Sequence, residues 1–267
     1  VIFFSSWGIM AGLGAGIGGY LTTVISREML FTVDFLTFVI SAFIVFSIKK
    51  DLSENKSTES NEETINFVDG IKYVLSKKEI LSLVITKATF SISASGLLSL
   101  FTVLSYEIYK TGDFGTGLMF GARGIGALIG PIVIRYFFGS TDGKLLNTIG
   151  ITIMAWGLFY FFIPFSTSVY ITVFLLILGH SGGGSQWAFS TYGLQVITPD
   201  KLRGRIAGID YSLYFFMNTI STLLIGYLAT VYGVLFVFKL FPVIGFIFGF
   251  LWYLTTRKIW KNLDLNN

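Results

Sequence analysis

The chain has 267 residues, of which 53% are hydrophobic, 17% aromatic and only 13% charged, and its net charge is +4 at pH 7. Because a soluble domain carries about 25% charged residues, this composition excludes an ordinary soluble domain and indicates a membrane protein. The sequence has no Cys, which excludes disulfides and thiol chemistry. The positive charge calls for no nucleic-acid partner, because the basic residues lie at the ends of apolar segments.

Apolar segments of membrane-spanning length follow one another along the chain. A helix needs ~20 apolar residues to cross ~30 Å of hydrocarbon. Inside lipid such a helix satisfies its own backbone hydrogen bonds. The predicted fold class is therefore all-α, a polytopic membrane helix bundle. We count eight segments, at residues 1–24, 30–48, 80–106, 114–138, 145–164, 169–191, 206–231 and 234–256.

Two of these helical hairpins repeat each other in sequence. GYLTTV at residues 19–24 returns as GYLATV at 226–231, and LFTVDF at 30–35 returns as LFVFKL at 235–240. Such repeats are typical of membrane transporters, although two apolar helices can also resemble each other by chance. If the hairpins are equivalent, six spans separate them, so we expect a six-plus-six bundle of which this chain is the latter part.

This repeat predicts four regions. Residues 1–48 would be the last two helices of an N-terminal half, and 79–256 a six-helix C-terminal half. Residues 49–78 would be a cytoplasmic linker, and 257–267 a cytoplasmic tail. The linker begins with a polar stretch and ends in a predicted amphipathic helix on the inner membrane surface, whose apolar residues are Phe67, Ile71, Val74 and Leu75.

Basic residues give the orientation. Most Lys and Arg residues lie in the linker or directly after the fourth, sixth and eighth segments, whereas the opposite loops hold only Arg27 and Lys110. An excess of positive charge marks the cytoplasmic side of a membrane protein. We therefore expect a multi-pass protein of the cell membrane with a cytoplasmic C-terminus. Its partners would be membrane lipid, a small-molecule substrate and the N-terminal helices of its own chain.

Two cations lie inside predicted spans, where ionisable residues are costly and become candidates for function. Lys87 lies ~12 Å into the third span from the inner side, and Arg123 lies ~13 Å into the fourth from the outer side. Either residue could bind an anionic or zwitterionic substrate. Lys87 could instead neutralise an acid in the preceding helices, and Arg123 could form an ion pair between helices.

The sixth span carries a polar, glycine-rich centre at residues 180–187. Three consecutive glycines weaken the helix and could let the backbone line a cavity. His180 and Gln186 offer hydrogen bonds there, and Trp187 offers an aromatic wall. His180 could carry protons or connect two helices. Because it is the only histidine, a His-pair metal site is excluded, and we predict no metal, no cofactor and no catalytic residue.

Asp210 lies just inside the seventh span, after Arg203 and Arg205. The helix dipole alone could stabilise its carboxylate there. Alternatively, Asp210 and the two arginines could form a gate on the inner side.

Two motifs resemble bacterial exporters of the major facilitator superfamily, a group that includes macrolide-efflux and siderophore-export permeases. Residues 198–206, TPDKLRGRI, resemble the inner loop between helices ten and eleven, and residues 121–126, GARGIG, resemble helix eight. Helix five of that group carries an antiporter motif, Gly-Pro-x-x-Gly-Gly. Here Gly14, Gly18 and Gly19 match the motif as helix-packing glycines, and Ala15 replaces the proline.

The resemblance implies that the eight segments are helices five to twelve. It places Lys87, Gln186 and Trp187 on the cavity, and Arg123 and Asp210 between the two halves. The function implied is a secondary-active exporter of drugs or small metabolites that works by proton-coupled alternating access. Alternatives are a facilitator or importer of the same fold, a non-transporting membrane protein or a membrane enzyme.

Overall fold

The computed structural model describes residues 10, 14, 17–47, 67–139 and 141–261. Within these ranges every regular element is helical, as the apolar pattern predicts. Six of the described helical segments are long and apolar enough to cross a membrane. They are Glu28–Ser47, Lys78–Ile108, Gly112–Phe138, Asp142–Phe165, Asp200–Tyr232 and Val234–Lys261.

A seventh long helix, α9 (Val169–Ile197), contains the predicted span at 169–191 but is not one of these six. Its polar centre, which includes His180 and Gln186, lowers its hydropathy. Most of the predicted first span lies outside the described residues. The predicted count of eight spans and the six-plus-six division therefore remain predictions.

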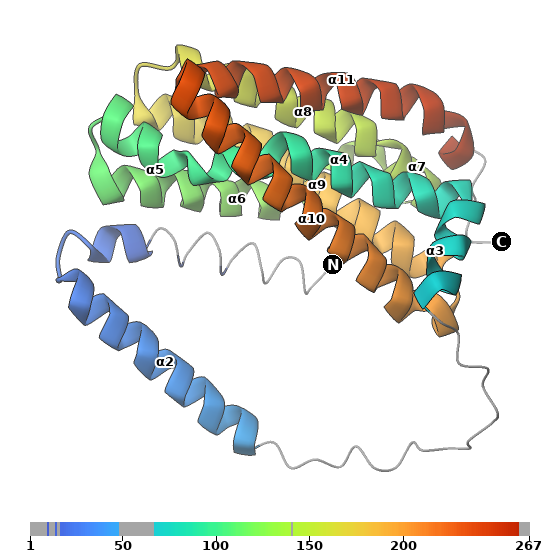
Figure 1. Cartoon of the computed structure of the whole chain (residues 1–267), viewed down its shortest axis with the longest axis horizontal. Coiled ribbons are helices and arrows are strands. Elements are labelled where there is room, and N and C mark those ends of the chain that lie inside the picture. The colour runs from blue at the N-terminus through green and yellow to red at the C-terminus, as the bar shows by residue number, and fades with distance from the viewer. Residues whose placement is uncertain (1–9, 11–13, 15–16, 48–66, 140, 262–267) are drawn as a thin grey trace.

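Helix α2 (Arg27–Ser47) lies apart from the other helices (Figure 1). Most of its apolar residues are exposed, and none of its described side chains is buried. A turn at residues 22–26 separates α2 from the preceding helical residues. In the segment that the sequence pairs with this one, α10 (Asp200–Tyr232) and α11 (Val234–Lys261) are joined at Gly233, whose φ of +90° suits glycine.

The remaining helices form one bundle (Figure 1). Helix α6 (Gly112–Phe138) packs along α9, and α8 (Ile149–Phe161) packs along both α9 and α11. Helix α4 (Lys78–Ser99) packs along α10. The predicted span at 80–106 is interrupted, because α4 is followed by a short α5 (Phe101–Val103) and a π-helical turn, η1 (Leu104–Ile108).

Helix boundaries differ from the predicted ones near the basic residues. Helix α10 begins at Asp200 rather than at residue 206, so Arg203 and Arg205 lie on a helix and not in a loop. Helix α11 continues to Lys261, so the first residues of the predicted tail are helical. The predicted span at 145–164 consists of α7 (Asp142–Asn147), α8 and a 3₁₀ turn, η2 (Ile163–Phe165).

The predicted amphipathic helix is present as α3 (Phe67–Ser76). Val74 is buried, and Gly70 faces α10 so closely that a Cβ there would lie 3.2 Å from Ile209 Cδ1. Phe67, Val68 and Leu75 remain exposed. An exposed apolar face next to lysines suits a membrane surface, so the location at the inner surface remains a prediction.

Glycines bring the helices of the bundle into close contact. Cβ atoms on Gly126 and Gly130 of α6 would collide with the backbone of Ile177 and Ser181 on α9. Small residues allow this approach between membrane helices. Of the predicted helix-packing glycines, Gly19 lies against Gly117 of α6, whereas Gly14 and Gly18 have no neighbour within 4 Å of an added Cβ among the described residues.

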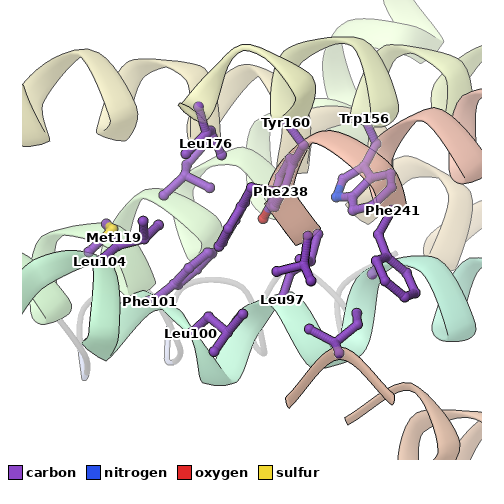
Figure 2. Close-up of a cluster of buried hydrophobic side chains, with 14 of the residues drawn as sticks. Leu97, Leu100, Phe101, Leu104, Met119, Trp156, Tyr160, Leu176, Phe238 and Phe241 are labelled. Carbon is purple, nitrogen blue, oxygen red and sulfur yellow. The ribbon is translucent and has the colours of Figure 1, made fainter. Parts of the chain in front are cut away.

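Two hydrophobic clusters fill the bundle, one toward each end. Figure 2 shows the first, in which Leu97, Phe101, Trp156, Tyr160 and Phe238 converge from four helices. The second cluster surrounds the α7 end and includes Leu83, Ile149 and Trp252. Phe90 packs against both clusters and so lies between them. We call this level, the middle of the bundle along its length, the waist.

Candidate functional site

A cavity of about 370 Å³ lies at this waist. Its wall is built from α4, α6, α8, α9 and α10. A pocket of this size falls within the range of ~300–1,000 Å³ typical of small-molecule sites. Six aromatic side chains form much of the wall: Phe90, Trp156, Trp187, Tyr211, Tyr214 and Phe215.

Arg123 and His180 supply polar groups to the cavity wall and contact each other. Arg123 Nε donates a hydrogen bond of 3.1 Å to His180 Nε2, which joins α6 to α9. The other ring nitrogen, Nδ1, lies 2.7 Å from the hydroxyl of Tyr160 on α8. The three side chains therefore form one chain of hydrogen bonds across three helices.

This arrangement fixes the protonation state of His180. A guanidinium can only donate, so His180 Nε2 must accept. The imidazole is then neutral, and its proton lies on Nδ1, which donates to Tyr160 Oη. A second proton on His180 would abolish the acceptor and place a positive charge beside Arg123. In this conformation His180 therefore positions Arg123 and connects helices.

The second polar group is an ion pair between α4 and α10. Lys87 Nζ lies 2.5 Å from Asp210 Oδ2, and the two side chains are only 1% and 2% exposed. A buried charge requires a partner of this kind. The sequence left open an acid in the preceding helices as the partner of Lys87, but its partner is Asp210 of this chain.

The ion pair lies directly behind the aromatic wall of the cavity. Lys87 Nζ is 4.9 Å from the centroid of the Trp187 ring and 5.5 Å from that of Tyr211. At such distances a cation is attracted to the face of an aromatic ring. Both rings line the cavity, so they separate the ion pair from it.

The other predicted gating residues do not pair with Asp210. Arg203 forms an exposed ion pair of 2.7 Å with Asp200, and Arg205 donates to the carbonyl of Lys201. Both arginines lie in the first two turns of α10, and neither lines the cavity.

Gln186 directly precedes Trp187 in the sequence and is fully buried, but it does not line the cavity. Its amide nitrogen and oxygen have no hydrogen-bond partner within the described part of the chain, and the same holds for Asp210 Oδ1. Buried polar atoms without partners are rare and call for an explanation.

Several residues of the site were missed from the sequence. Tyr160, Tyr211 and Tyr214 did not stand out among 13 tyrosines. The spacing of polar residues does indicate which helices meet. Lys87 and Ser91 lie one turn apart on α4, and their partners on α10, Asp210 and the carbonyl of Tyr214, are also one turn apart.

Comparison with known proteins identifies the family. The model of the transmembrane secretion effector family matches residues 4–266. BacE of Bacillus amyloliquefaciens, named as a bacilysin exporter, is 24% identical over 198 residues, which cover 74% of this chain and 49% of BacE. YkuC of Bacillus subtilis (strain 168), named as an uncharacterised MFS-type transporter, is 24% identical over 226 residues, which cover 80% of this chain and 52% of YkuC.

The chain spans about half the length of the curated relatives it matches. The match to the family extends over nearly all of its residues, and the helical bundle with a cavity at its waist agrees with the match. The chain belongs to the transmembrane secretion effector family of the major facilitator superfamily, a group of multi-pass membrane transporters and not of enzymes.

Proposed function

We propose that this chain is the C-terminal part of a secondary-active exporter that moves a small molecule out of the cell in exchange for protons. The cavity at the waist would bind the cargo, and one six-helix half would rock against the other around it. The longer relatives, one of them named as an exporter, support this proposal.

The observation that carries the proposal is the buried Lys87–Asp210 pair directly behind the cavity wall. Ionisable groups in a membrane are costly, and they mark the paths of ions and substrates. A pair used only to hold two helices together could be replaced by apolar contacts at little cost. Its place behind Trp187 and Tyr211 suits a group that responds to protons and acts on the cargo site.

The coupling step would be protonation of Asp210. A proton on this carboxylate removes the attraction on Lys87 Nζ, so protonation and the ion pair exclude each other. Water entering from the cavity would satisfy Asp210 Oδ1 and the Gln186 amide, which lack partners among the described residues. Gln186 would thus belong to the proton pathway. His180, held neutral by Arg123, would serve the cargo site rather than the proton pathway.

The orientation follows from the ends of the helices. The starts of α4 and α10 and the ends of α6 and α11 lie at one end of the bundle, together with α3 and α7 (Figure 1). That end carries most of the basic residues. By the positive-inside rule it would face the cytoplasm, as would the C-terminus. Arg203 and Arg205 would then gate the inner side through contacts with the preceding half.

Inverted membrane vesicles from cells expressing the full-length transporter test both coupling and direction. Naphthalene-1-sulfonate is a suitable probe, because it stays charged and crosses lipid slowly. An exporter should accumulate the probe inside inverted vesicles during respiration, and an uncoupler should abolish the accumulation. An importer would deplete the probe from the inside of the vesicles. A facilitator would equilibrate the probe across the membrane whether or not the uncoupler is present.

A further inference from the structure

We infer that α3 binds the surface of a bilayer that contains anionic phospholipid, with an apolar arc of its side chains in the lipid and its neighbouring lysines on the phosphate headgroups. This inference concerns how the bundle is attached to the membrane, and it does not depend on what the transporter moves.

The first step is the fixed position of α3 on the bundle. Val74 is buried in the second hydrophobic cluster. A Cβ added to Gly70 would lie 3.2 Å from Ile209 Cδ1 and 3.5 Å from Arg205 Cβ, both on α10. Figure 1 shows α3 at one end of the bundle, where it runs across α4 and α10 rather than along them. If these two helices span the membrane, a helix that crosses them at their end lies along the membrane surface.

The second step concerns the apolar arc, which is exposed although the opposite rotation of α3 would bury it. Successive residues are turned by about 100° around a helix, so the centre of this arc lies about 90° from the buried side at Gly70 and Val74. The side beyond the arc carries Asp69 and Ser76, which are polar and exposed. A helix on a bilayer beside a protein needs this order, with one side on the protein, the next in lipid and the last in water. The apolar arc consists of Phe67, Val68, Ile71 and Leu75.

The third step concerns the charges beside the arc. Lys72 lies at the edge of the apolar arc, and Lys77 and Lys78 continue the positive charge to the start of α4. All three lysines are exposed. Of the two acids in this segment, Asp69 lies on the side away from the arc, and Glu79 is half-buried. Lysines placed this way can lay their alkyl chains along apolar surface and reach anionic headgroups with their ammonium groups.

A second protein surface, such as the preceding half of the transporter, is the competing occupant of the apolar arc. The centre of a protein interface is depleted in lysine, because each ammonium must give up its water there. At a bilayer surface the same ammonium groups keep their water and gain phosphate partners. The lysines beside the arc therefore favour an anionic bilayer over a protein partner.

The test measures which lipid lies against the apolar arc in the full-length transporter. This chain has no Cys, so Leu75→Cys gives a single site in it for the fluorophore NBD, once any cysteines elsewhere in the transporter are replaced. Ser76→Cys, on the polar side, is the matched control for position. The labelled proteins are reconstituted in equal parts of phosphatidylcholine and phosphatidylglycerol, and either lipid carries a nitroxide quencher near its headgroup.

The label at Leu75→Cys should be quenched by lipid, and the label at Ser76→Cys much less. Nitroxide on phosphatidylglycerol should quench at least about twofold more strongly than nitroxide on phosphatidylcholine, because each lysine near the surface favours the anionic lipid. The triple variant Lys72→Gln/Lys77→Gln/Lys78→Gln should remove this preference. Arg257→Gln/Lys258→Gln/Lys261→Gln removes as much charge from exposed residues at the end of α11 and should leave the preference unchanged.

Three results would overturn the inference. Equal quenching at the two labelled positions would mean that the apolar arc does not face lipid. Equal quenching by the two lipids, a comparison that needs no charge variant, would mean that the surface does not select anionic phospholipid. A preference lost equally in both triple variants would assign it to the net charge of this end and not to α3. None of these measurements involves transport, so they leave the proposed export untouched.

Discussion

At the residue scale, the sequence identified the unusual charges but not their partners. Lys87, Arg123 and Asp210 stood out because ionisable residues are rare in apolar segments. Lys87 and Asp210 are 123 positions apart, and without the packing of α4 against α10 nothing in the sequence connects them. His180 was ambiguous for the same reason, because its two hydrogen-bond partners come from two other helices.

The Lys87–Asp210 pair gives a sharp prediction for a double-mutant cycle. Lys87→Met alone or Asp210→Asn alone breaks a buried pair, and each should destabilise the protein by about 3–5 kcal/mol where the remaining group stays charged. The double variant removes both charges and should recover most of this loss. The free energies of unfolding of the three variants, measured in detergent, would test this prediction. Additive losses in the double variant would mean that the two charges do not interact.

At the element scale, α4 and α10 are joined by polar contacts at successive turns. Beyond the ion pair, Ser91 donates to the carbonyl of Tyr214 at 3.1 Å. Ser221 Oγ donates to the carbonyl of Ile92 at 2.9 Å and accepts from the backbone N–H of Gly96 at 3.0 Å. Both helices run in the same direction, so these contacts form one seam. We expect α4 and α10 to move as a unit during transport.

Gly96 is the point of closest approach in this seam. A Cβ there would lie 2.6 Å from the carbonyl oxygen of Ser221 and 2.9 Å from Ile225 Cβ. Gly96→Ala should destabilise the chain by about 1–3 kcal/mol through overpacking. Gly226→Ala is the matched control on α10, because an added Cβ there has no neighbour within 4 Å in the described structure. The melting temperatures of the two variants are compared. Equal melting temperatures would exclude a tight contact between α4 and α10 at Gly96.

The positions of the helices can be predicted from the sequence where hydropathy determines them. Long apolar segments located the helices, and the amphipathic spacing located α3. The interruption after Ser99 was missed, because residues 100–108 are as apolar as a continuous helix. The predicted start of α10 at residue 206 is too late, because polar residues at a membrane surface can be helical without being apolar.

At the scale of the whole molecule, α2 and the length of the relatives point to the same conclusion. A helix that is apolar and exposed along its length needs lipid or other helices around it. The relatives are about twice as long as the part that this chain matches. The alternating access that we propose needs two halves, and we propose that the described bundle belongs to one of them.

This conclusion predicts that the chain by itself does not transport. Reconstituted alone, it should show no more gradient-driven flux of naphthalene-1-sulfonate than empty vesicles, because no second half closes the cavity. The full-length transporter in the same lipid is the control. Robust driven flux by the 267-residue chain would refute the six-plus-six architecture.

The most direct test of the whole account is flux through the purified full-length transporter in proteoliposomes with and without an imposed pH gradient. The unmodified protein should move naphthalene-1-sulfonate against its concentration gradient only when protons flow the other way. The Lys87→Met/Asp210→Asn double variant should fold, and it should at most equilibrate the probe, because it lacks the group that exchanges the proton. Gradient-driven accumulation by this folded double variant, or flux through the unmodified protein that ignores the pH gradient, would contradict proton-coupled export through the buried pair.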